Sequence, residues 1–207
     1  MKSMIKDAAI LLVITLFAGL ILGLVYQITK EPIAQAEEKA AKEAYAEVFP
    51  DAAEFEMSEL AGSEDADFAA RWTEAGFEGV DVENALTAKG SDGETLGYVL
   101  TVTSHEGYGG DITFTMGIRN DGTLNGISIL SISETAGLGM KAEAVLKPQF
   151  ADKKVPVFTY TKTGAASEGQ IDAISGATIT TNAVTTAVNG GLFYFQEQLG
   201  GGSDEAE

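Results

Sequence analysis

The sequence predicts an α+β protein, in which a single N-terminal transmembrane helix is followed by a domain with an antiparallel sheet and flanking helices. Three patterns support this fold class. A run of 22 residues without a charge extends from Ala8 to Thr29. Apolar residues alternate with others between Thr95 and Ile132, with turn residues between the runs, as in antiparallel strands. From Ile179 to Leu199, apolar residues recur with a helical period.

The uncharged run is long enough to cross a hydrocarbon core of about 30 Å as a helix. A cleaved signal peptide is the alternative, because Ala34-Gln35-Ala36 offers a small-x-small cleavage site. Signal peptides have apolar regions of only about 7–15 residues, so we expect a retained anchor over residues 1–30. Charge does not decide its orientation, because lysines flank both ends of the run: Lys2, Lys6, Lys30, Lys39 and Lys42.

The next two segments are predicted less sharply. Residues 31–50 are rich in Ala and Glu and predict a helical stalk, with Pro32 in its first turn and Pro50 at its end. Residues 51–92 are acidic and weakly periodic, and we expect loops and a short helix there.

From Thr95 on, the elements can be assigned in order. Strands are expected over 96–103, 112–118 and 124–132, with Asn120-Asp121-Gly122 as a turn, which gives an antiparallel meander. A short helical stretch over 142–150, a strand over 155–162 and the long helix over 179–199 follow. The acidic, glycine-rich residues 200–207 are expected to form a disordered tail.

Composition excludes several kinds of function. The chain has 13 Lys and Arg residues against 31 Asp and Glu residues and a net charge of −18, which argues against binding to nucleic acid or to anionic lipid. It has no cysteine, so it can hold neither a disulfide nor a cysteine-ligated iron–sulfur cluster. With His105 as its one histidine, we expect no haem and no metal site.

The most informative motif is Asp172-Ala173-Ile174-Ser175-Gly176-Ala177-Thr178, directly before the long C-terminal helix. Ser175 is a candidate N-cap, and Gly176 and Ala177 leave the backbone accessible to a bulky group. An anion at Thr178 would be stabilised by the unpaired N–H groups and the dipole of the helix. The alternative is an ordinary capped turn, because Ser, Gly and Thr are common where helices begin.

The motif resembles the D-x-x-S-G-A-T sequence at which a flavin transferase esterifies FMN, through its phosphate, onto the last threonine. The resemblance implies that Thr178 is a covalent anchor for a redox cofactor and no catalyst. It implies FMN contacts at Ser175, Gly176 and Ala177, and assigns Asp172 to recognition by the transferase.

A second segment, Glu134-Thr135-Ala136-Gly137-Leu138-Gly139, resembles the E-T-x-G-L-G loop of the same flavoproteins, which wraps the isoalloxazine ring; Ala136 replaces the usual proline. The resemblance implies that Glu134 and Thr135 hydrogen-bond the polar edge of the ring and that Leu138 offers it an apolar face. Gly137 and Gly139 are expected where the ring comes too close for a Cβ. Lys162, ahead of the acceptor motif, is expected near the ring. Two further assignments stay open: Lys141 as a surface charge, and Tyr108 as a packing or a stacking residue.

Together with the N-terminal run, which ends in Lys30-Glu31-Pro32-Ile33, these motifs resemble the G subunit of Rnf complexes. A relative of this family is the C subunit of sodium-pumping NADH:quinone oxidoreductases. The resemblance implies an FMN-binding domain over 51–199 on the extracytoplasmic side of the cell membrane. It also implies electron transfer in a complex that couples ferredoxin:NAD⁺ oxidation–reduction to Na⁺ or H⁺ translocation.

The implied partners are membrane lipid, the transferase and other membrane subunits, including a second flavin-carrying subunit and iron–sulfur subunits. No dinucleotide fingerprint is present, so NAD⁺ and ferredoxin are expected to react on those subunits. Three alternatives stay open: the equivalent subunit of a quinone reductase, a free-standing tethered flavoprotein, and an anchored binding domain without flavin.

Overall fold

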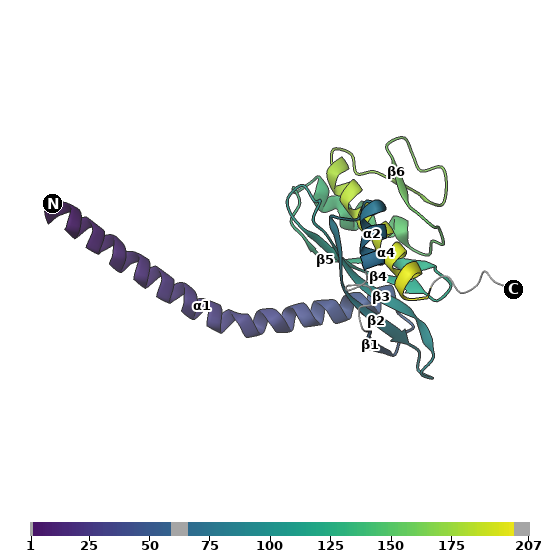
Figure 1. Ribbon diagram of the computed structural model, residues 1–207, viewed down its shortest axis with the longest axis horizontal. Coiled ribbons are helices and arrows are strands. Elements are labelled where there is room, and N and C mark those ends of the chain that lie inside the picture. Colours follow the sequence, from purple (N-terminus) through teal and green to yellow (C-terminus); the bar gives the residue numbers. More distant parts are fainter. Residues whose placement is uncertain (1, 59–65, 201–207) are drawn as a thin grey trace. The chain divides into compact units, whose positions relative to one another are not determined.

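The computed structural model describes residues 2–58 and 66–200 (Figure 1). The chain divides into two units, one up to Ala41 and one from Lys42 on, which are described separately. The expected tail beyond Gly200 lies outside the described residues.

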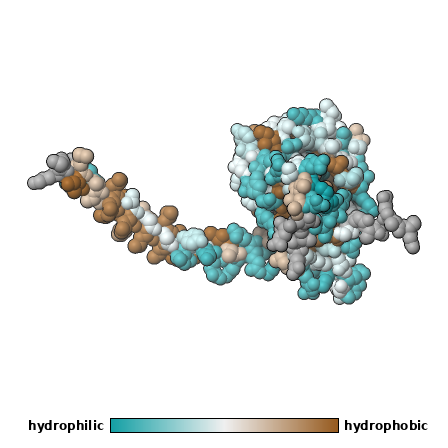
Figure 2. All heavy atoms as spheres, viewed as in Figure 1, coloured by the Kyte–Doolittle hydropathy of each residue, from teal (hydrophilic) through white to brown (hydrophobic). Residues whose placement is uncertain are grey.

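Helix α1 extends from Lys2 to Val48 without interruption, so the residues predicted as a stalk are helical up to Val48, but the expectation that a helix begins at Glu31, with Pro32 in its first turn, is wrong. Pro32 lies inside the helix. A proline removes one backbone hydrogen bond, and the Ala- and Glu-rich residues that follow have high helix propensity, which sustains the helix beyond it. Among the described residues, α1 is the one helix long and apolar enough to cross a membrane, judged by length and composition. Its apolar side chains between Ile10 and Ile28 are exposed, as Figure 2 shows.

The second unit is built on a five-stranded antiparallel meander, in the order β1-β2-β3-β4-β5. The strands are β1 (Glu54–Ser58), β2 (Val80–Lys89), β3 (Thr95–Ser104), β4 (Ile112–Arg119) and β5 (Leu124–Ile132). The three strands from β3 on are confirmed. Strands β1 and β2 fall where only loops and a short helix were expected; the short helix is α2 (Ala66–Glu74).

Helix α4 (Thr178–Gln198) packs against β2, β3 and β4 and confirms the expected C-terminal helix. Its buried face includes Ala183, Val184, Ala187 and Val188, which join the main core with Leu100, Phe114 and Met116 of the sheet. A smaller cluster forms where Val48 and Phe49, at the end of α1, pack with residues of β2 and β3: Leu86, Ala88 and Val99.

Short elements connect the sheet to α4. The expected helix over 142–150 is a succession of the 3₁₀ helix η1 (Gly139–Lys141), the one-turn helix α3 (Ala142–Val145) and the 3₁₀ helix η2 (Lys147–Phe150). The strand expected over 155–162 is limited to β6 (Thr159–Thr161), which pairs in parallel with β7 (Gln170–Asp172). The Glu134 motif therefore follows β5 and reaches the first residue of η1, and the Asp172 motif extends from the last residue of β7 to the first residue of α4.

Candidate functional site

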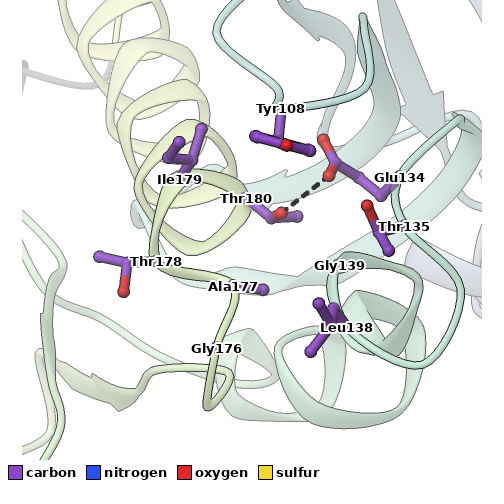
Figure 3. A pocket seen from close by; sticks show the side chains of 10 residues that line it. All are labelled: Tyr108, Glu134, Thr135, Leu138, Gly139, Gly176, Ala177, Thr178, Ile179 and Thr180. Carbon is purple, nitrogen blue, oxygen red and sulfur yellow. Dashed lines mark hydrogen bonds between the residues drawn. The ribbon is translucent and has the colours of Figure 1, made fainter.

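A pocket of about 500 Å³ lies where the loop after β5 meets the beginning of α4 (Figure 3). Its volume falls within the roughly 300–1,000 Å³ of small-molecule sites. It joins the two segments that the sequence singled out, about forty residues apart, and adds a residue of the β3–β4 loop. The lining residues are Tyr108, Glu134, Thr135, Leu138, Gly139, Gly176, Ala177, Thr178, Ile179 and Thr180.

The turn before α4 is closed by the backbone. The Ala177 N–H donates to the Ile174 carbonyl at 3.0 Å, and Gly176 has a φ of +80° that favours glycine. The N-cap residue is Ala177, without a side-chain cap, so the prediction that Ser175 caps the helix is wrong. Ser175 is exposed and does not line the pocket. The Thr181 hydroxyl takes a comparable role, because it accepts from the Ile174 N–H at 3.1 Å and donates to the Ala177 carbonyl at 2.9 Å.

Threonine hydroxyls at the beginning of α4 differ in access. Thr180 and Thr181 are buried, and both hydroxyls donate hydrogen bonds within the protein. Thr178, the first residue of α4, is partly exposed on the pocket wall. Within the described part of the chain, its hydroxyl has no hydrogen-bond partner. Of these three threonines, Thr178 therefore has the hydroxyl best placed to react with a molecule in the pocket.

Glu134 is buried, with 8% of its surface exposed, and both of its carboxylate oxygens contact the protein. Oε2 accepts from the Thr180 hydroxyl at 3.0 Å, the dashed line in Figure 3, and Oε1 accepts from the Gly109 N–H at 3.2 Å. Sequence reasoning missed Thr180. Thr180 could have been identified by its position two residues after Thr178, on the buried side of the helix.

The two glycines of the Glu134 loop have reasons within the protein. A Cβ at Gly139 would lie 2.6 Å from the Thr180 hydroxyl and 2.7 Å from Glu134, so a side chain is excluded there by the protein itself. Gly137 has a φ of +79°, and a Cβ there would face open space. Proximity to a ring is therefore not needed to explain either glycine.

Three side chains at the pocket are apolar and exposed: Tyr108 by 71%, Ile179 by 52% and Leu138 by 40%. Figure 3 shows Tyr108 and Leu138 on opposite sides of the opening, with Thr135 beside Glu134. Apolar walls with a few convergent polar groups suit a flat aromatic ligand. The beginning of α4, with its unpaired N–H groups, suits a phosphate. The residues present therefore fit FMN.

Other residues singled out by the sequence lie outside the pocket lining. Lys162 and Lys141 are exposed and do not line it. The Asp172 carboxylate accepts from the Ala165 N–H at 2.7 Å and so holds the loop after β6. The side chain of Gln149 brackets the backbone of Asp172, accepting from its N–H at 2.6 Å and donating to its carbonyl at 3.1 Å.

The loop that carries Tyr108 is also held on its outer side. His105 lies between Asp81 of β2 and Asp111, with 3.0 Å from Nε2 to the first carboxylate and 3.0 Å from Nδ1 to the second. These hydrogen bonds, that to Asp81 first, raise the pKa of His105 above its ordinary value. This loop is thus tied to the sheet by His105 and to the pocket by Glu134.

Two regions of the chain match models of known protein families. Residues 1–48 match the RnfG N-terminal region and residues 107–192 match the FMN-binding domain. The G subunit of the Na⁺-translocating ferredoxin:NAD⁺ oxidoreductase complex of Acetobacterium woodii is 34% identical, over 94% of this chain and 93% of the relative. The chain belongs to the family of G subunits of ion-translocating oxidoreductase complexes. The G subunit of such a complex from Methanosarcina acetivorans is 33% identical, over 96% of this chain and 98% of that one.

A solved structure shows a weaker likeness. The crystal structure of NqrC from Shewanella oneidensis has 20% sequence identity and a TM-score of 0.46, covering 55% of this chain and 57% of that one. The FMN-binding domain match is the more useful for the site, because all ten pocket-lining residues fall within residues 107–192.

Proposed function

We propose that this chain is an electron-transfer subunit that carries FMN esterified through its phosphate to Thr178. It works in a membrane complex that couples electron transfer between ferredoxin and NAD⁺ to translocation of Na⁺ or H⁺. The names of its relatives support this complex, and the FMN-binding domain match supports the cofactor. Bound FMN would supply one-electron and two-electron oxidation and reduction.

The observation that carries the attachment site is the difference among the threonines of the acceptor segment. The buried hydroxyls of Thr180 and Thr181 already donate hydrogen bonds within the protein, whereas Thr178 lies on the pocket wall and, among the described residues, its hydroxyl has no hydrogen-bond partner. Attachment forms a bond between Thr178 Oγ1 and the phosphorus of the flavin donor and breaks the bond from that phosphorus to the donor's leaving group, which departs with the hydroxyl proton. Relative to free FMN and the unmodified chain, the product lacks one water.

The chain's own residues would divide the work between the two ends of the cofactor. At α4, the backbone N–H groups of the first turn and the helix dipole stabilise the phosphate charge. At the opening of the pocket, Tyr108, Leu138 and Ile179 provide apolar contacts for the ring and exclude water from its faces. Lys162 and Asp172 lie outside this pocket lining, so Lys162 is proposed as a nearby charge and Asp172 as a contact for the transferase.

The partners follow from the family and from the composition of the chain. NAD⁺ and ferredoxin would react on other subunits, including iron–sulfur subunits, and a second flavin-carrying membrane subunit would exchange electrons with this one. Helix α1 would anchor the chain in the cell membrane as a single span, with the domain on the extracytoplasmic side.

Thr178→Val tests the attachment site. The wild-type protein, isolated from membranes that contain the transferase, should show an intact mass increased by FMN less one water. Peptide mass spectrometry should place the increase on Thr178, and the denatured polypeptide should remain yellow and fluorescent. Thr178→Val should lose the increase and stay folded, whereas Thr186→Val, a threonine-to-valine change within α4, should keep it.

Each other outcome has a defined meaning. Modification of Thr180 or Thr181 would reject Thr178 but keep a flavoprotein. A wild-type chain that carries no flavin would reject the redox function in favour of an anchored binding domain. Co-purification with a quinone reductase would reject the ferredoxin:NAD⁺ complex.

A further inference from the structure

Three segments of the domain converge on the carboxylate of Glu134. Glu134 itself follows β5, Gly109 lies in the β3–β4 loop and Thr180 lies in the first turn of α4. The carboxylate accepts one hydrogen bond from each of the other two segments, at 3.2 Å from the Gly109 N–H and 3.0 Å from the Thr180 hydroxyl. It therefore joins the three parts of the chain that line the pocket.

Close packing fixes the position of this carboxylate. A Cβ at Gly139 would come within 2.7 Å of Oε2, and a Cβ at Gly107 would come within 2.8 Å of Oε1. Backbone therefore lies close to both oxygens. The carboxylate has little room to turn, which is the condition for a hydrogen bond to fix its partner.

Hydrogen bonds are what stabilise this buried group. In the part of the chain that the structure describes, no lysine, arginine or histidine forms an ion pair with Glu134. A buried carboxylate without a cation depends on its donors, and hydrogen bonds to a charged acceptor are stronger than neutral ones. Loss of the Thr180 hydroxyl would therefore loosen the first turn of α4 from the pocket.

We propose that Glu134 and Thr180 are positioning residues, whose hydrogen bond fixes the first turn of α4 and thereby holds Thr178 in place at the pocket wall. The inference rests on the proposed function, because Thr178 must be the site of attachment for its position to matter. In this proposal, Glu134 acts through Thr180 and the first turn of α4. The resemblance had instead suggested direct contact between Glu134 and the polar edge of the ring.

Thr180→Val tests the proposal in the full-length chain, because valine keeps the size of the side chain and removes the hydroxyl. With purified transferase, we expect the initial rate of FMN attachment to fall by about tenfold, the order expected for one lost hydrogen bond to a charged group. The visible circular dichroism of the attached flavin should also change, since the ring would no longer be held in one orientation.

Two variants serve as controls. Thr180→Ser keeps the hydroxyl and should restore the wild-type rate and circular dichroism. Thr185→Val makes the same change in the same helix, at a buried threonine whose hydroxyl donates to the Thr181 carbonyl at 2.7 Å. It should match the wild-type protein in both measurements, whatever it costs in stability.

Glu134→Met gives an independent test, because methionine keeps an unbranched side chain of similar length and accepts neither hydrogen bond well. Its effects should resemble those of Thr180→Val, and the double variant should be no worse than the more affected single one. Wild-type rates and circular dichroism in Glu134→Met would overturn the proposal, even if Thr180→Val failed to fold. A wild-type chain that takes up no flavin would instead reject the proposed function.

Discussion

Threonines that are close in sequence differ in this domain in whether their hydroxyl groups are available to react. Each hydroxyl in the first turn of α4 can donate one hydrogen bond, and a hydroxyl that donates to a buried acceptor is costly to withdraw. Thr180 and Thr181 are in that situation, whereas Thr178 is not. Selectivity for one threonine can therefore begin in the folded domain, before any enzyme distinguishes among them.

Gly139 and Gly137 provide a prediction at the scale of one residue. Gly139→Ala should destabilise the domain by about 1–3 kcal/mol through overpacking and disturb the pocket, because the new methyl group meets Glu134 and Thr180. Gly137→Ala should cost about 1 kcal/mol from its φ of +79° alone and leave the pocket unchanged. Urea unfolding gives both free energies, and the absorption spectrum of the bound flavin reports on the pocket. A shifted spectrum in Gly137→Ala alone would contradict this assignment.

His105 predicts a pH dependence. Its pKa is raised in the folded state by hydrogen bonds to Asp81 and Asp111, so the imidazolium form stabilises the fold. This contribution is fully present below the unfolded pKa of about 6.5 and is lost as the pH rises through the higher folded pKa. The difference in melting temperature between the wild-type protein and His105→Gln should therefore shrink as the pH is raised from about 6 to about 9. A difference that stays constant over this range would show that the ring acts by packing.

At the scale of elements, the end of α1 is part of the domain's packing. Phe49 is 3% exposed and lies over two strands at glycines: a Cβ would come within 2.7 Å of its ring at Gly97 and within 3.0 Å at Gly117. The small residues leave space for the ring. The cluster of Val48, Phe49, Leu86, Ala88 and Val99 therefore fixes where the helix ends on the sheet.

Phe49→Ala should lower the free energy of unfolding of the domain by about 3–5 kcal/mol, the usual cost of a buried phenylalanine. The matched change Phe17→Ala, at a side chain that is 63% exposed in the apolar part of α1, should leave the unfolding of the domain unchanged. Urea denaturation of both full-length variants in detergent, followed by the fluorescence of Trp72, measures the difference. Equal unfolding curves would show that the cluster contributes little.

Elements with strong internal periodicity were predictable from sequence, and those defined by their neighbours were not. Strands β3, β4 and β5 and helix α4 have clear patterns. Strand β1 has the acidic sequence Glu54-Phe55-Glu56, and β2 is interrupted by a bulge between Val82 and Asn84, so neither shows a continuous alternation. Pairing with a neighbour makes them strands.

The candidate site, too, was predictable from the sequence only in part. Its two motifs were found because they resemble motifs of a flavoprotein family, since their residue types alone are those of ordinary turns, and the structure brings the segments together. The direction of each side chain depends on contacts far away in sequence. The Glu134 carboxylate bonds to Gly109 and Thr180, and Thr181 rather than Ser175 bonds the turn before α4, neither of which local sequence specifies.

At the scale of the whole molecule, charge and hydropathy are segregated along the chain. The uncharged run between Ala8 and Thr29 lies in α1, whereas most of the acidic residues lie beyond it. The net charge of −18 favours hydration of the domain and gives it little attraction to anionic lipid. A single apolar helix would therefore hold the domain at the membrane, without a basic surface.

The sidedness of the domain is the last prediction, and the absence of cysteine makes it easy to measure. Cysteine introduced at Met57, which is 76% exposed in the domain, should react with a membrane-impermeant maleimide in intact cells stripped of their walls. Cysteine introduced at Lys6, on the other side of the uncharged run, should react only after lysis. Because the helix crosses the bilayer once, the two labels must give opposite results. Labelling at position 6 and protection at position 57 before lysis would show that the domain is cytoplasmic. A mature N-terminus found beyond Ala36 would show that the apolar segment is a cleaved signal peptide.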